Sequence, residues 1–441
     1  MSSTPQHAEV LVVGAGPAGM AAATAAANHG RKVIVLDDNP AAGGQIWREG
    51  IAAKKHHEQG SVRAKRRAAF SSAGAQMLAG RRVAHVPQQG RLSTVMDTPL
   101  GVMQESFAWD RLILATGARE RFLPFPGWTL PGVLGAGSLQ ALVKGGYPVQ
   151  GKRVVIAGTG PLLLAVAAYL QSAGARVTCI AEQASFAQLL PFAAGLSLHL
   201  GKLFQGIRYR ASLSRVPYRT GWWPVAVEKS GSGLVVWLTN GTRVLSEPCD
   251  ALACGFHLVP NTELAELLGC RFNGDAVAVD EQQQTSVPNI FCAGEPTGIA
   301  GLDAALVQGE IAGLAAAEQR SKAAAFDKRR AREQVFSKRM NKAFQLRAEL
   351  RGLCAADTIV CRCEDVPFAR LQGRTSWTEA KLQTRCGMGP CQGRICGPAV
   401  QTLFGWRSTS VRPPIFPMPV STFANTGSES LEESTIYQET K

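Results

Sequence analysis

Four cysteines in the C-terminal part of the sequence have the spacing of a metal-cluster site. Cys361 and Cys363 are separated by one residue, and Cys391 and Cys396 follow after the 27 residues 364–390. Four thiolates from two short loops suit a [2Fe–2S] cluster, which takes two cysteines for each iron. Zinc also accepts four thiolates, but its usual loops carry C-x2-C pairs. A zinc site, or loss of the cluster, is the alternative interpretation.

A glycine-rich turn near the N-terminus is typical of a dinucleotide site. Gly14, Gly16 and Gly19 form G-x-G-x-x-G between an expected strand at 9–13 and an expected helix at 20–28. The first glycine permits a tight turn, the second lets a pyrophosphate approach, and the third lets the helix pack on the strand. The helix N-terminus then faces the phosphates with its partial positive charge.

An acid completes this pattern. Asp37 ends the next expected strand, at 32–36, and lies 18 residues beyond Gly19. A carboxylate in this position can accept hydrogen bonds from a ribose. Strand, glycines, helix, strand and acid together indicate a nucleotide-binding unit far more strongly than the glycines alone.

The same order begins again 144 residues later, with an expected strand at 153–157, but it departs from the pattern. Gly158 and Gly160 are present, whereas Leu163 stands where the third glycine belongs. Glu182 follows the second strand of this unit, with no arginine pair for a 2′-phosphate. We therefore favour a scaffold domain that binds another nucleotide or nothing, with NAD at Gly158–Gly160 as the alternative.

Two such units predict an α/β fold with two Rossmann-like dinucleotide-binding domains rather than one sheet. Residues 214–250 are rich in β-branched residues, with a turn expected at Asn240-Gly241. A strand is expected within 285–295 and an alanine-rich helix at 302–317. Residues 326–350 read as one long basic helix that leads to a small C-terminal domain.

Charge and hydropathy exclude several classes of protein. The net charge is +14, and residues 320–351 alone carry eleven Lys and Arg against three acids. No aromatic-rich basic module accompanies these residues, so we expect no nucleic-acid partner. No run of 18 apolar residues and no signal peptide is present, which favours a cytoplasmic protein with reduced thiols.

Several short motifs resemble flavoprotein disulfide reductases and related enzymes with two dinucleotide domains. They are Gly43-Gly44-Gln45, Ala115-Thr116-Gly117 and the turn that ends at Gly294-Glu295. The resemblance implies that the first unit binds FAD, that Glu295 approaches the ribityl chain, and that the second unit interrupts the FAD domain. The turn lacks one spacer residue and has Glu where Asp is commoner. The implied FAD-binding residues are Gly14, Gly16, Pro17, Ala18, Gly19, Asp37, Gly44, Gln45, Thr116, Gly117, Gly294 and Glu295.

The cysteine-containing strings CRCEDV and TRCGMGPCQGRICG are similar to the bacterioferritin-associated-ferredoxin-like (BFD-like) [2Fe–2S] family. By position, that resemblance makes Cys361, Cys363, Cys391 and Cys396 the ligands. It leaves Cys386 out, because relatives often carry a small non-ligand residue there. The remaining cysteines form no C-x-x-C redox pair and read as small buried hydrophobic residues.

The order of motifs along nearly the whole chain resembles the alpha (A) subunits of the opine oxidase, hydroxyproline dehydrogenase and hydrogen cyanide synthase group. This resemblance implies an amino-acid-oxidase-like flavoprotein partner that dehydrogenates an amino or imino acid, such as an opine or hydroxyproline. The present chain would then pass electrons to a respiratory-chain acceptor. The basic helix would rest on an acidic partner or, as a peripheral contact, on an anionic membrane surface; a solvated connector is the alternative.

Two other functions remain open at this point. One is a self-sufficient NADH-dependent flavin reductase that passes electrons out through its cluster. The other is a non-catalytic scaffold. No acid, base or carboxylate-binding arginine can be assigned to catalysis from the sequence. The expected segments are the first part of the FAD domain (1–145), the inserted NAD-like domain (146–270), the second part of the FAD domain (271–320), the basic connector (321–357), the BFD-like domain (358–420) and a polar tail (421–441).

Overall fold

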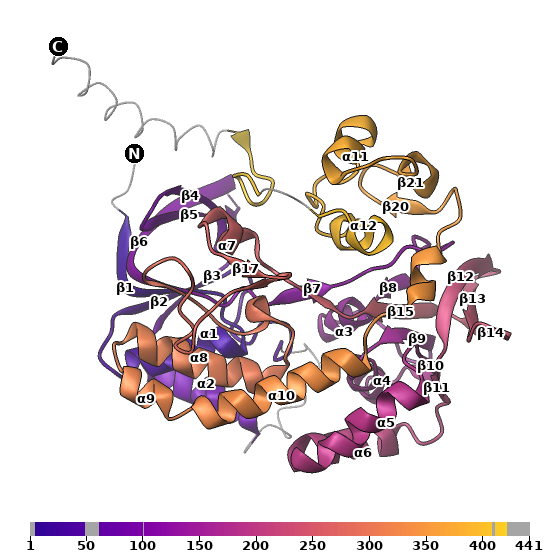
Figure 1. Cartoon of the computed structure of the whole chain (residues 1–441), viewed down its shortest axis with the longest axis horizontal. Helices are drawn as coiled ribbons and strands as arrows, with labels where there is room; N and C mark the ends of the chain where they lie inside the picture. The colour runs from indigo at the N-terminus through magenta and orange to yellow at the C-terminus, as the bar shows by residue number, and fades with distance from the viewer. Residues whose placement is uncertain (1–4, 49–60, 100, 408–410, 421–441) are drawn as a thin grey trace.

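The computed structural model describes residues 5–48, 61–99, 101–407 and 411–420. Two sheet-and-helix units lie side by side, and a small domain built from the C-terminal part of the chain lies against the second unit (Figure 1). Within the described residues, no helix is long and apolar enough to cross a membrane.

The first unit is built on a seven-stranded sheet with the order β3-β2-β1-β6-β5-β4, in which β19 also pairs with β6. Strands β3, β2, β1, β6 and β19 pair in parallel, whereas β4 and β5 form an antiparallel extension. The carboxyl ends of the parallel strands therefore share one edge, where ligands bind in such sheets. The strands are β1 (Gln6–Val13), β2 (Val33–Asp37), β3 (Gln76–Ala79), β4 (Arg82–Gln88), β5 (Arg91–Thr98), β6 (Gly101–Leu114) and β19 (Ile290–Cys292).

Helices α1 (Pro17–Ala27) and α8 (Leu302–Ala316) pack closely together on this sheet, although they are far apart in sequence. Two glycines of α8 allow the contact. A Cβ atom at Gly309 would lie 2.2 Å from the carbonyl oxygen of Ala18, and one at Gly313 would lie 2.2 Å from that of Ala22. This packing holds the segment around β19 against the start of α1. Helix α2 (Val62–Ser72) also contacts α1.

The second unit has five parallel strands in the order β11-β10-β9-β15-β8. An antiparallel sheet, β12-β13-β14, packs beside it, with the expected turn at 240–241 between β13 and β14. The strands are β8 (Val133–Gly135), β9 (Arg153–Thr159), β10 (Arg176–Glu182), β11 (Tyr218–Thr220), β12 (Trp223–Ser230), β13 (Gly233–Thr239), β14 (Val244–Cys249) and β15 (Ala251–Phe256). The helices are α3 (Ala136–Lys144), α4 (Leu162–Ser172), α5 (Phe186–Gly195) and α6 (Leu200–Ser212).

The chain passes between the two units along a pair of short antiparallel strands. β7 (Ala118–Glu120) leaves the first unit directly after β6, and β16 (Leu258–Pro260) returns to it from β15. Helix α7 (Glu263–Leu267) follows β16, and a two-stranded sheet comes next, formed by β17 (Phe272–Asn273) and β18 (Ala276–Val277). The end of β6 is thereby connected to the second unit through β7.

The basic connector is shorter as a helix than we expected. After the short α9 (Arg320–Ala324), α10 runs from Asp327 to Ala343 and stops, so the prediction of one helix over 326–350 is wrong. We expected Phe336, Met340, Ala343 and Leu350 on one face of that helix. The first three do share a cluster, which Phe344 joins. The helix ends there because residues 344–347 turn into contacts with the second unit, described below. Leu350 lies in a different core.

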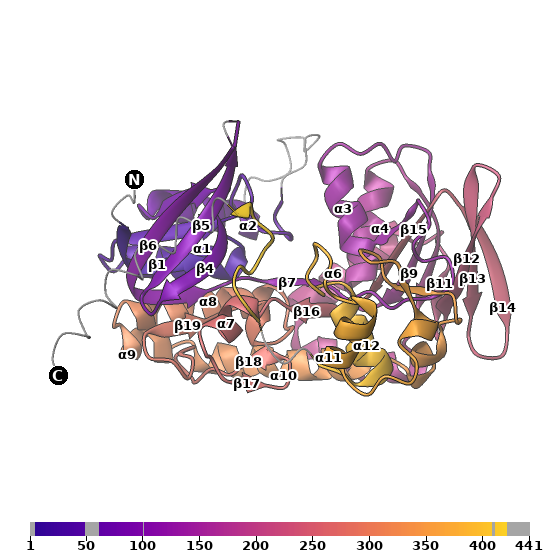
Figure 2. The ribbon, with the colours of Figure 1, turned by 90° about the horizontal axis from the view of Figure 1, so that it is seen from above.

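The C-terminal domain is small and mostly helical. It contains β20 (Ile359–Cys361), β21 (Val366–Pro367), α11 (Trp377–Thr384) and α12 (Cys396–Phe404) around its own core. The indole N–H of Trp128 donates to the carbonyl of Ile359 at 2.6 Å, which ties this domain to the second unit. Figure 2 shows α11 and α12 near the second unit. Residues 411–420 then return to the first unit, where the Ile415 N–H donates to the Ala84 carbonyl at 2.7 Å.

Candidate functional site

The first glycine turn has the conformation that a nucleotide loop requires. Gly14 has φ +103°, and a Cβ atom there would lie 2.2 Å from the Ala115 carbonyl oxygen. A Cβ atom at Gly19 would lie 1.7 Å from the Gly14 carbonyl oxygen, so this position also excludes a side chain. Gly16 differs, because its φ of −71° suits any residue and its nearest neighbour would be 4.0 Å away. The protein alone does not require a glycine at 16, which points to a ligand as the reason for it.

Asp37 lies at the end of β2 beside this turn. Its carboxylate accepts the Ala15 N–H at 2.5 Å and the backbone and side-chain N–H groups of Asn39 at 2.8 Å. Asp37 is 7% exposed, while the following residues Asp38 and Pro40 lie at the surface. The acid is thus fixed against the start of α1, where Pro17 and Ala18 form the first turn.

Segments distant in sequence complete this edge of the first sheet. The Gly43 N–H donates to the Ala15 carbonyl at 2.8 Å, which places Gly44 next to Gly16. Gly294, with φ +82°, lies so close to Ala18 that an added Cβ would be 2.9 Å from the Ala18 Cβ. The predicted residues Gly14 to Gly19, Asp37, Gly44 and Gly294 therefore lie together.

Four other predicted residues have different surroundings. The Glu295 carboxylate accepts the N–H groups of Ala300 and Gly301, both at 3.0 Å, and burial raises its pKa. Within the described residues, Glu295 therefore orders its own loop. Gln45 is exposed. Thr116 follows β6 and exchanges hydrogen bonds with Asn261, to which the Gly117 carbonyl is also bonded.

The acid of the second unit, Glu182, is buried against its own glycine turn. The Glu182 carboxylate accepts the Thr159 hydroxyl at 2.8 Å, the Gly160 N–H at 2.8 Å and the Ala184 N–H at 2.9 Å. It is fully buried, and burial raises its pKa to about 7 against the opposing effect of these three donors. Leu163, in place of the third glycine, is 1% exposed and packs in the core of this unit.

The connector covers this acid. Gln183, next to Glu182 and also fully buried, donates to the Thr159 hydroxyl at 2.9 Å and to the Gln345 carbonyl at 3.1 Å. The side-chain carbonyl oxygen of Gln183 accepts the Arg347 N–H at 3.1 Å. Sequence reasoning missed this cover, because residues 345–347 carry no motif and lie more than 160 positions away.

Five cysteines, rather than the four predicted, come together in the C-terminal domain. The sulfur atoms of Cys361, Cys386 and Cys396 lie within 4.8 Å of one another. Cys391 contacts both Cys396 and Cys363 through its sulfur. Cys386, which the resemblance left out, is fully buried in this group. A signal for it was available, because it lies only five residues before Cys391.

Backbone N–H groups surround these sulfurs. Those of Gly387 and Glu364 point to Cys361, and those of Gly393 and Ile395 point to Cys391. Hydrogen bonds from Cys386 and Cys396 are the main cause that lowers the pKa of Cys361, to about 2. A hydrogen bond from Cys396 is the main cause that lowers the pKa of Cys391, to about 5. Cys361 and Cys391 thus favour the thiolate, the form that binds metals, whereas the pKa of their donors Cys386 and Cys396 is raised, as is that of Cys363.

The glycines of this loop are required by space as well as by conformation. A Cβ at Gly387, which has φ +82°, would lie 2.5 Å from the Trp377 ring. A Cβ at Gly389 would lie 2.3 Å from the Cβ of Cys363. A cavity of about 230 Å³ adjoins the sulfurs, lined by Phe122, Cys361, Arg362, Cys363, Cys391, Ile395 and Cys396. A close group of sulfurs, two of which favour the thiolate, beside a cavity of this size fits a metal centre.

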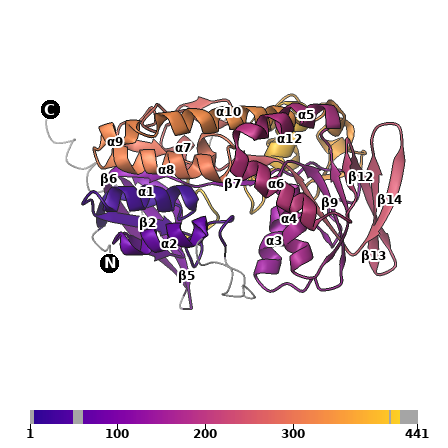
Figure 3. The same cartoon turned by 90° about the horizontal axis from the view of Figure 1, so that it is seen from below.

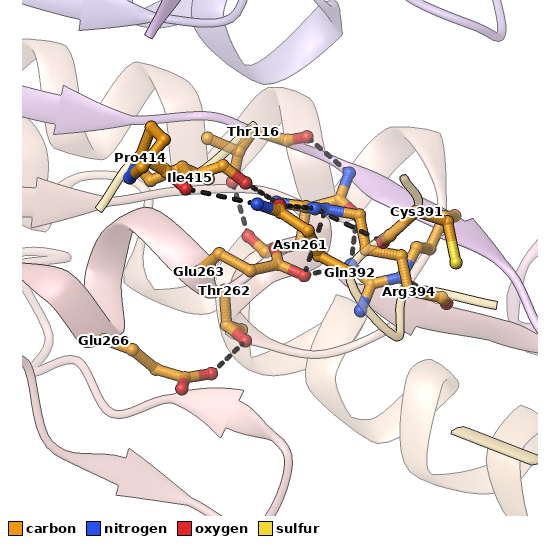
Figure 4. A network of polar contacts seen from close by, with 11 residues as sticks. Thr116, Asn261, Thr262, Glu263, Glu266, Cys391, Gln392, Arg394, Pro414 and Ile415 are labelled. Atoms are coloured by element: carbon orange, nitrogen blue, oxygen red, sulfur yellow. Dashed lines mark hydrogen bonds and ion pairs between the residues drawn. The ribbon is translucent and has the colours of Figure 1, made fainter. Parts of the chain in front are cut away.

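A polar network joins this cysteine loop to the end of β6 (Figure 4). Arg119, on β7, donates to the Arg394 carbonyl at 3.2 Å and to the Asn261 side chain at 2.8 Å. The Glu263 carboxylate lies 2.8 Å from Arg119 and 3.6 Å from Arg394, and so bridges the two guanidinium groups. Asn261 continues the network to Thr116.

Arg394 anchors the other side of this network. It donates to the Cys391 carbonyl at 3.4 Å and to the Ile415 carbonyl at 2.6 Å. One arginine thus joins the cysteine loop to the segment that returns to the first unit. The two predicted cofactor regions are connected by side chains of a few residues.

The remaining cysteines are separate from this site. Cys179, Cys249, Cys254, Cys270 and Cys292 are buried, and burial raises the pKa of each thiol. Cys354 donates to the Pro124 carbonyl at 3.3 Å, and burial raises its pKa to about 12. Such thiols are unreactive, as expected from the sequence.

Two dinucleotide-type units joined through β7 and β16 define an oxidoreductase of the two-nucleotide-domain class. The chain belongs to the pyridine nucleotide-disulphide oxidoreductase family, whose model matches residues 8–319. The family implies FAD. The predicted fold, with two Rossmann-like units and a small cysteine-containing C-terminal domain, is confirmed.

Several relatives match almost the whole chain. The HcnB subunit of hydrogen cyanide synthase from Pseudomonas aeruginosa is 33% identical, over 95% of this chain and 99% of the relative. The A-type subunit of opine oxidase from Agrobacterium tumefaciens is 30% identical, over 92% of this chain and 87% of the relative. The predicted resemblance to these subunits is thus confirmed, and the chain is an oxidoreductase homologous to subunits of multi-subunit enzymes.

Solved structures show the same fold at lower identity. The L-proline dehydrogenase from P. horikoshii superposes with a TM-score of 0.59 and 17% identity, over 96% of this chain and 80% of that chain. The T. acidophilum thioredoxin reductase gives a TM-score of 0.53 and 21% identity, over 71% of this chain and 98% of that chain. The thioredoxin reductase thus has no counterpart to more than a quarter of the present chain.

Proposed function

We propose that this chain is the FAD- and [2Fe–2S]-containing subunit of a multi-subunit amino or imino acid dehydrogenase. An amino-acid-oxidase-like flavoprotein partner would oxidise an opine, hydroxyproline or a related compound at its C–N bond. This chain would relay the electrons to an acceptor of the respiratory chain. FAD supplies two-electron chemistry and a [2Fe–2S] cluster one-electron chemistry, which suits such a relay.

The observation that carries the proposal is the polar network between the two candidate cofactor regions. Arg119 and Glu263 connect the Thr116 turn, at the end of β6, with Arg394 in the cysteine loop. A connection through so few residues holds the cysteine loop in a defined position against the first unit. Redox partners in one chain require such a fixed position.

We assign FAD to the first unit because a glycine at this edge of the sheet is not required by the packing of the protein itself. Gly16 is free of steric requirement, and Gly44 and Gly294 line the same region. The N–H groups at the start of α1 and the acid Asp37 supply donors and an acceptor there. These features support Gly14, Gly16, Pro17, Ala18, Gly19, Asp37, Gly44 and Gly294 as FAD-binding residues. Gln45, Thr116, Gly117 and Glu295 are proposed for the same set from the resemblance alone.

The cluster is assigned to Cys361, Cys363, Cys391 and Cys396, with Cys386 as a neighbouring thiol. The competing assignment replaces the exposed Cys363 by the buried Cys386, which lies in the tight group of three sulfurs. Cys363→Ala and Cys386→Ala separate the two assignments. Loss of the cluster in the first variant alone supports the proposed ligands, and loss in the second alone supports the competing set.

The test is anaerobic purification of the chain, followed by a visible spectrum, metal analysis and low-temperature EPR after reduction with dithionite. The proposal requires bound flavin, iron with inorganic sulfide, and the EPR signal of a reduced [2Fe–2S] cluster. Zinc in place of iron would overturn the cluster assignment. A colourless chain that holds neither metal nor flavin would overturn the proposal as a whole and favour a scaffold.

The partner is tested by adding substrate. Candidate amino and imino acids are expected to bleach the flavin of this chain only after the second, flavoprotein subunit has been added. The alternative, a self-sufficient reductase, predicts bleaching of the purified chain by NADH alone. The connector, which hydrogen-bonds to Gln183 next to the acid of the second unit, favours the partner-dependent outcome.

A further inference from the structure

Helices α5 and α6 present large apolar side chains to solvent. Both helices lie at the margin of the second unit and face the viewer when the molecule is seen from below (Figure 3). We call this surface the hairpin face. Its large apolar members and their exposed fractions are Phe186 (67%), Leu190 (56%), Leu200 (60%), Phe204 (67%) and Ile207 (54%). Monomeric proteins rarely expose so many large apolar residues together, so such a surface marks an interaction site.

The fold does not require these residues. The opposite sides of α5 and of the turn that follows it supply Leu189, Phe192 and Leu196, which pack with Phe336 and Met340 of α10. The core contact of α5 is therefore already formed by other residues. The outer residues recur at helical spacing, with Phe186 and Leu190 four apart on α5 and Leu200, Phe204 and Ile207 four and three apart on α6.

The segment that forms the hairpin face carries charge of one sign, and the nearest acids, Glu333 and Asp303, both pair with Lys202. Residues 183–227 contain no Asp or Glu, but they contain Lys202, Arg208, Arg210, Arg215 and Arg219. Lys202 is paired with Glu333 at 2.6 Å, whereas Arg208 and Arg215 are exposed. On the neighbouring α10, the Arg339 guanidinium lies close to Gly195 at the end of α5.

The buried histidine between the two helices reflects this positive potential. His199 precedes α6 and is 6% exposed. Burial lowers its pKa first of all, and the charges of Lys202, Arg332 and Arg339 lower it further against the opposing charge of Glu333. Cations from both α6 and α10 therefore lie close enough to His199 to affect its protonation.

We propose that the hairpin face is a docking surface for an anionic phospholipid bilayer. Two short helices with Phe, Leu and Ile outward, basic residues beside them and no acid within their own segment are typical of segments that lie in a membrane interface. Exposed Lys and Arg gain attraction from anionic headgroups without any groove in the partner. A protein partner would instead have to supply a concave apolar surface for two projecting helices.

The orientation fits a peripheral contact. In Figure 1, α5 and α6 lie at the lower edge of the molecule, on the side opposite α11 and α12 of the cysteine domain. Contact of the hairpin face with a bilayer leaves that domain free. The proposal goes beyond the electron relay and does not depend on it, because it concerns only α5, α6 and the adjoining part of α10.

The test is flotation of the full chain with vesicles of phosphatidylcholine, with and without phosphatidylglycerol. We expect binding to the anionic vesicles, weaker binding as salt is raised, and little binding to phosphatidylcholine alone. The double substitution Phe186→Ser/Phe204→Ser is expected to weaken binding by about tenfold or more. The double substitution Arg208→Gln/Arg215→Gln is expected to weaken it less and to reduce its salt dependence.

Leu382→Ser is the matched control, because Leu382 is 75% exposed on α11 of the cysteine domain. It should leave vesicle binding unchanged. Equal loss in this control, full binding by the Phe186/Phe204 variant, or failure of the unaltered chain to float would each overturn the proposal. A Phe186/Phe204 variant that floats normally but no longer binds the partner subunit would make this face a protein interface.

Flavin content, the EPR signal and circular dichroism are recorded on the same preparations. Unchanged values in the Phe186→Ser/Phe204→Ser variant show that the lost binding is not lost folding. Failure of the electron relay appears in the flavin and EPR signals of the unaltered chain, whereas failure of the present proposal appears only in flotation. The two results are therefore distinguishable.

Discussion

The two βαβ units of this chain begin alike and differ in what surrounds the acid at the end of the second strand. Asp37 in the first unit and Glu182 in the second both accept a backbone N–H from their glycine turn. The residues after Asp37 return to the surface, whereas Gln183 is fully buried beneath the connector. The same local pattern thus leaves the residues after the acid at the surface in the first unit and buries them in the second.

The difference shows that a nucleotide fingerprint defines a turn rather than a binding site. In the first unit, close contacts with Gly44 and Gly294 surround a position, Gly16, that the protein leaves without a side chain. In the second unit, Gln345 and Arg347 supply the hydrogen bonds that a ligand would otherwise supply to Gln183 and its neighbours. The connector thus occupies the side chain of Gln183, beside the acid of the second unit.

Replacement of Gly16 is expected to have the largest effect. Gly16→Val fits the backbone, because φ is −71° and the nearest atom to a Cβ would be 4.0 Å away. The added side chain would block the approach of the pyrophosphate, so we expect FAD affinity to fall by about 100-fold or more. Titration of the apoprotein with FAD, followed by fluorescence, measures the change.

Gly160→Ala in the second unit is the control for this prediction. Its φ of +107° makes the substitution mildly strained, although no atom lies within 4 Å of the added Cβ. FAD affinity should not change. Loss of flavin from the Gly160 variant, with retention in the Gly16 variant, would reverse the roles of the two units.

Replacement of Leu163, at the third position of the second glycine turn, is expected to have the next largest effect. Leu163 is 1% exposed in the core of the second unit, so Leu163→Ala should destabilise the chain by about 2–5 kcal/mol. FAD content under native conditions should be retained. Denaturant unfolding with a flavin measurement on each sample checks both statements. Acquisition of flavin bleaching by NADH in this variant would show that Leu163 alone prevents NAD binding.

The connector contact should have a smaller effect. Gln183→Ala removes bonds to the Thr159 hydroxyl, the Gln345 carbonyl and the Arg347 N–H, so we expect a loss of about 1–3 kcal/mol. Limited proteolysis should then cut the connector near 345–347 more rapidly. Gln205→Ala, at the exposed face of α6, should change stability by no more than about 0.5 kcal/mol. Equal proteolysis of both variants would contradict the proposed role of the connector.

Much of the fold follows from the sequence because its signals are local. Strands β1, β2, β9 and β10 and helix α1 carry continuous apolar runs between glycine turns, and they form within a few residues of the expected positions. Helix α10 was predicted too long because periodicity alone does not reveal a tertiary contact. Phe344 leaves the helix to join the core formed with α5, which no local pattern signals.

The residues of the candidate sites likewise fall into those that local motifs predict and those that only tertiary contacts reveal. The glycines of the first turn and the C-x-C pair are local motifs, so their positions could be predicted. The role of Arg119 could not, because its partners Asn261 and Arg394 lie 142 and 275 residues away. The hairpin face was missed for a related reason. Apolar residues at helical spacing usually indicate a core, and only the packing of α10 on the inner side shows that the outer side is free.

The pH dependence of stability tests the enclosure of Glu182 itself. Burial raises its pKa to about 7 in the folded chain, from 4.5, so the folded state binds the proton more tightly. Stability from this group is fully present below pH 4.5 and is lost as the pH rises through 7. Glu182→Gln cannot titrate, so it should gain stability relative to the unaltered chain between pH 5 and 8, by about 3 kcal/mol at most.

The trend with pH, rather than the absolute stability, decides this last prediction. The amide introduced by Glu182→Gln places an N–H against the donors at Gly160, Thr159 or Ala184, and that cost is the same at every pH. Urea unfolding of both chains at several pH values separates the two contributions. A constant difference would mean that Glu182 stays ionised because its three donors outweigh burial. The second unit would then hold an ionised carboxylate, as a ligand site could. The two units would then differ only in the connector that covers the residue after the acid.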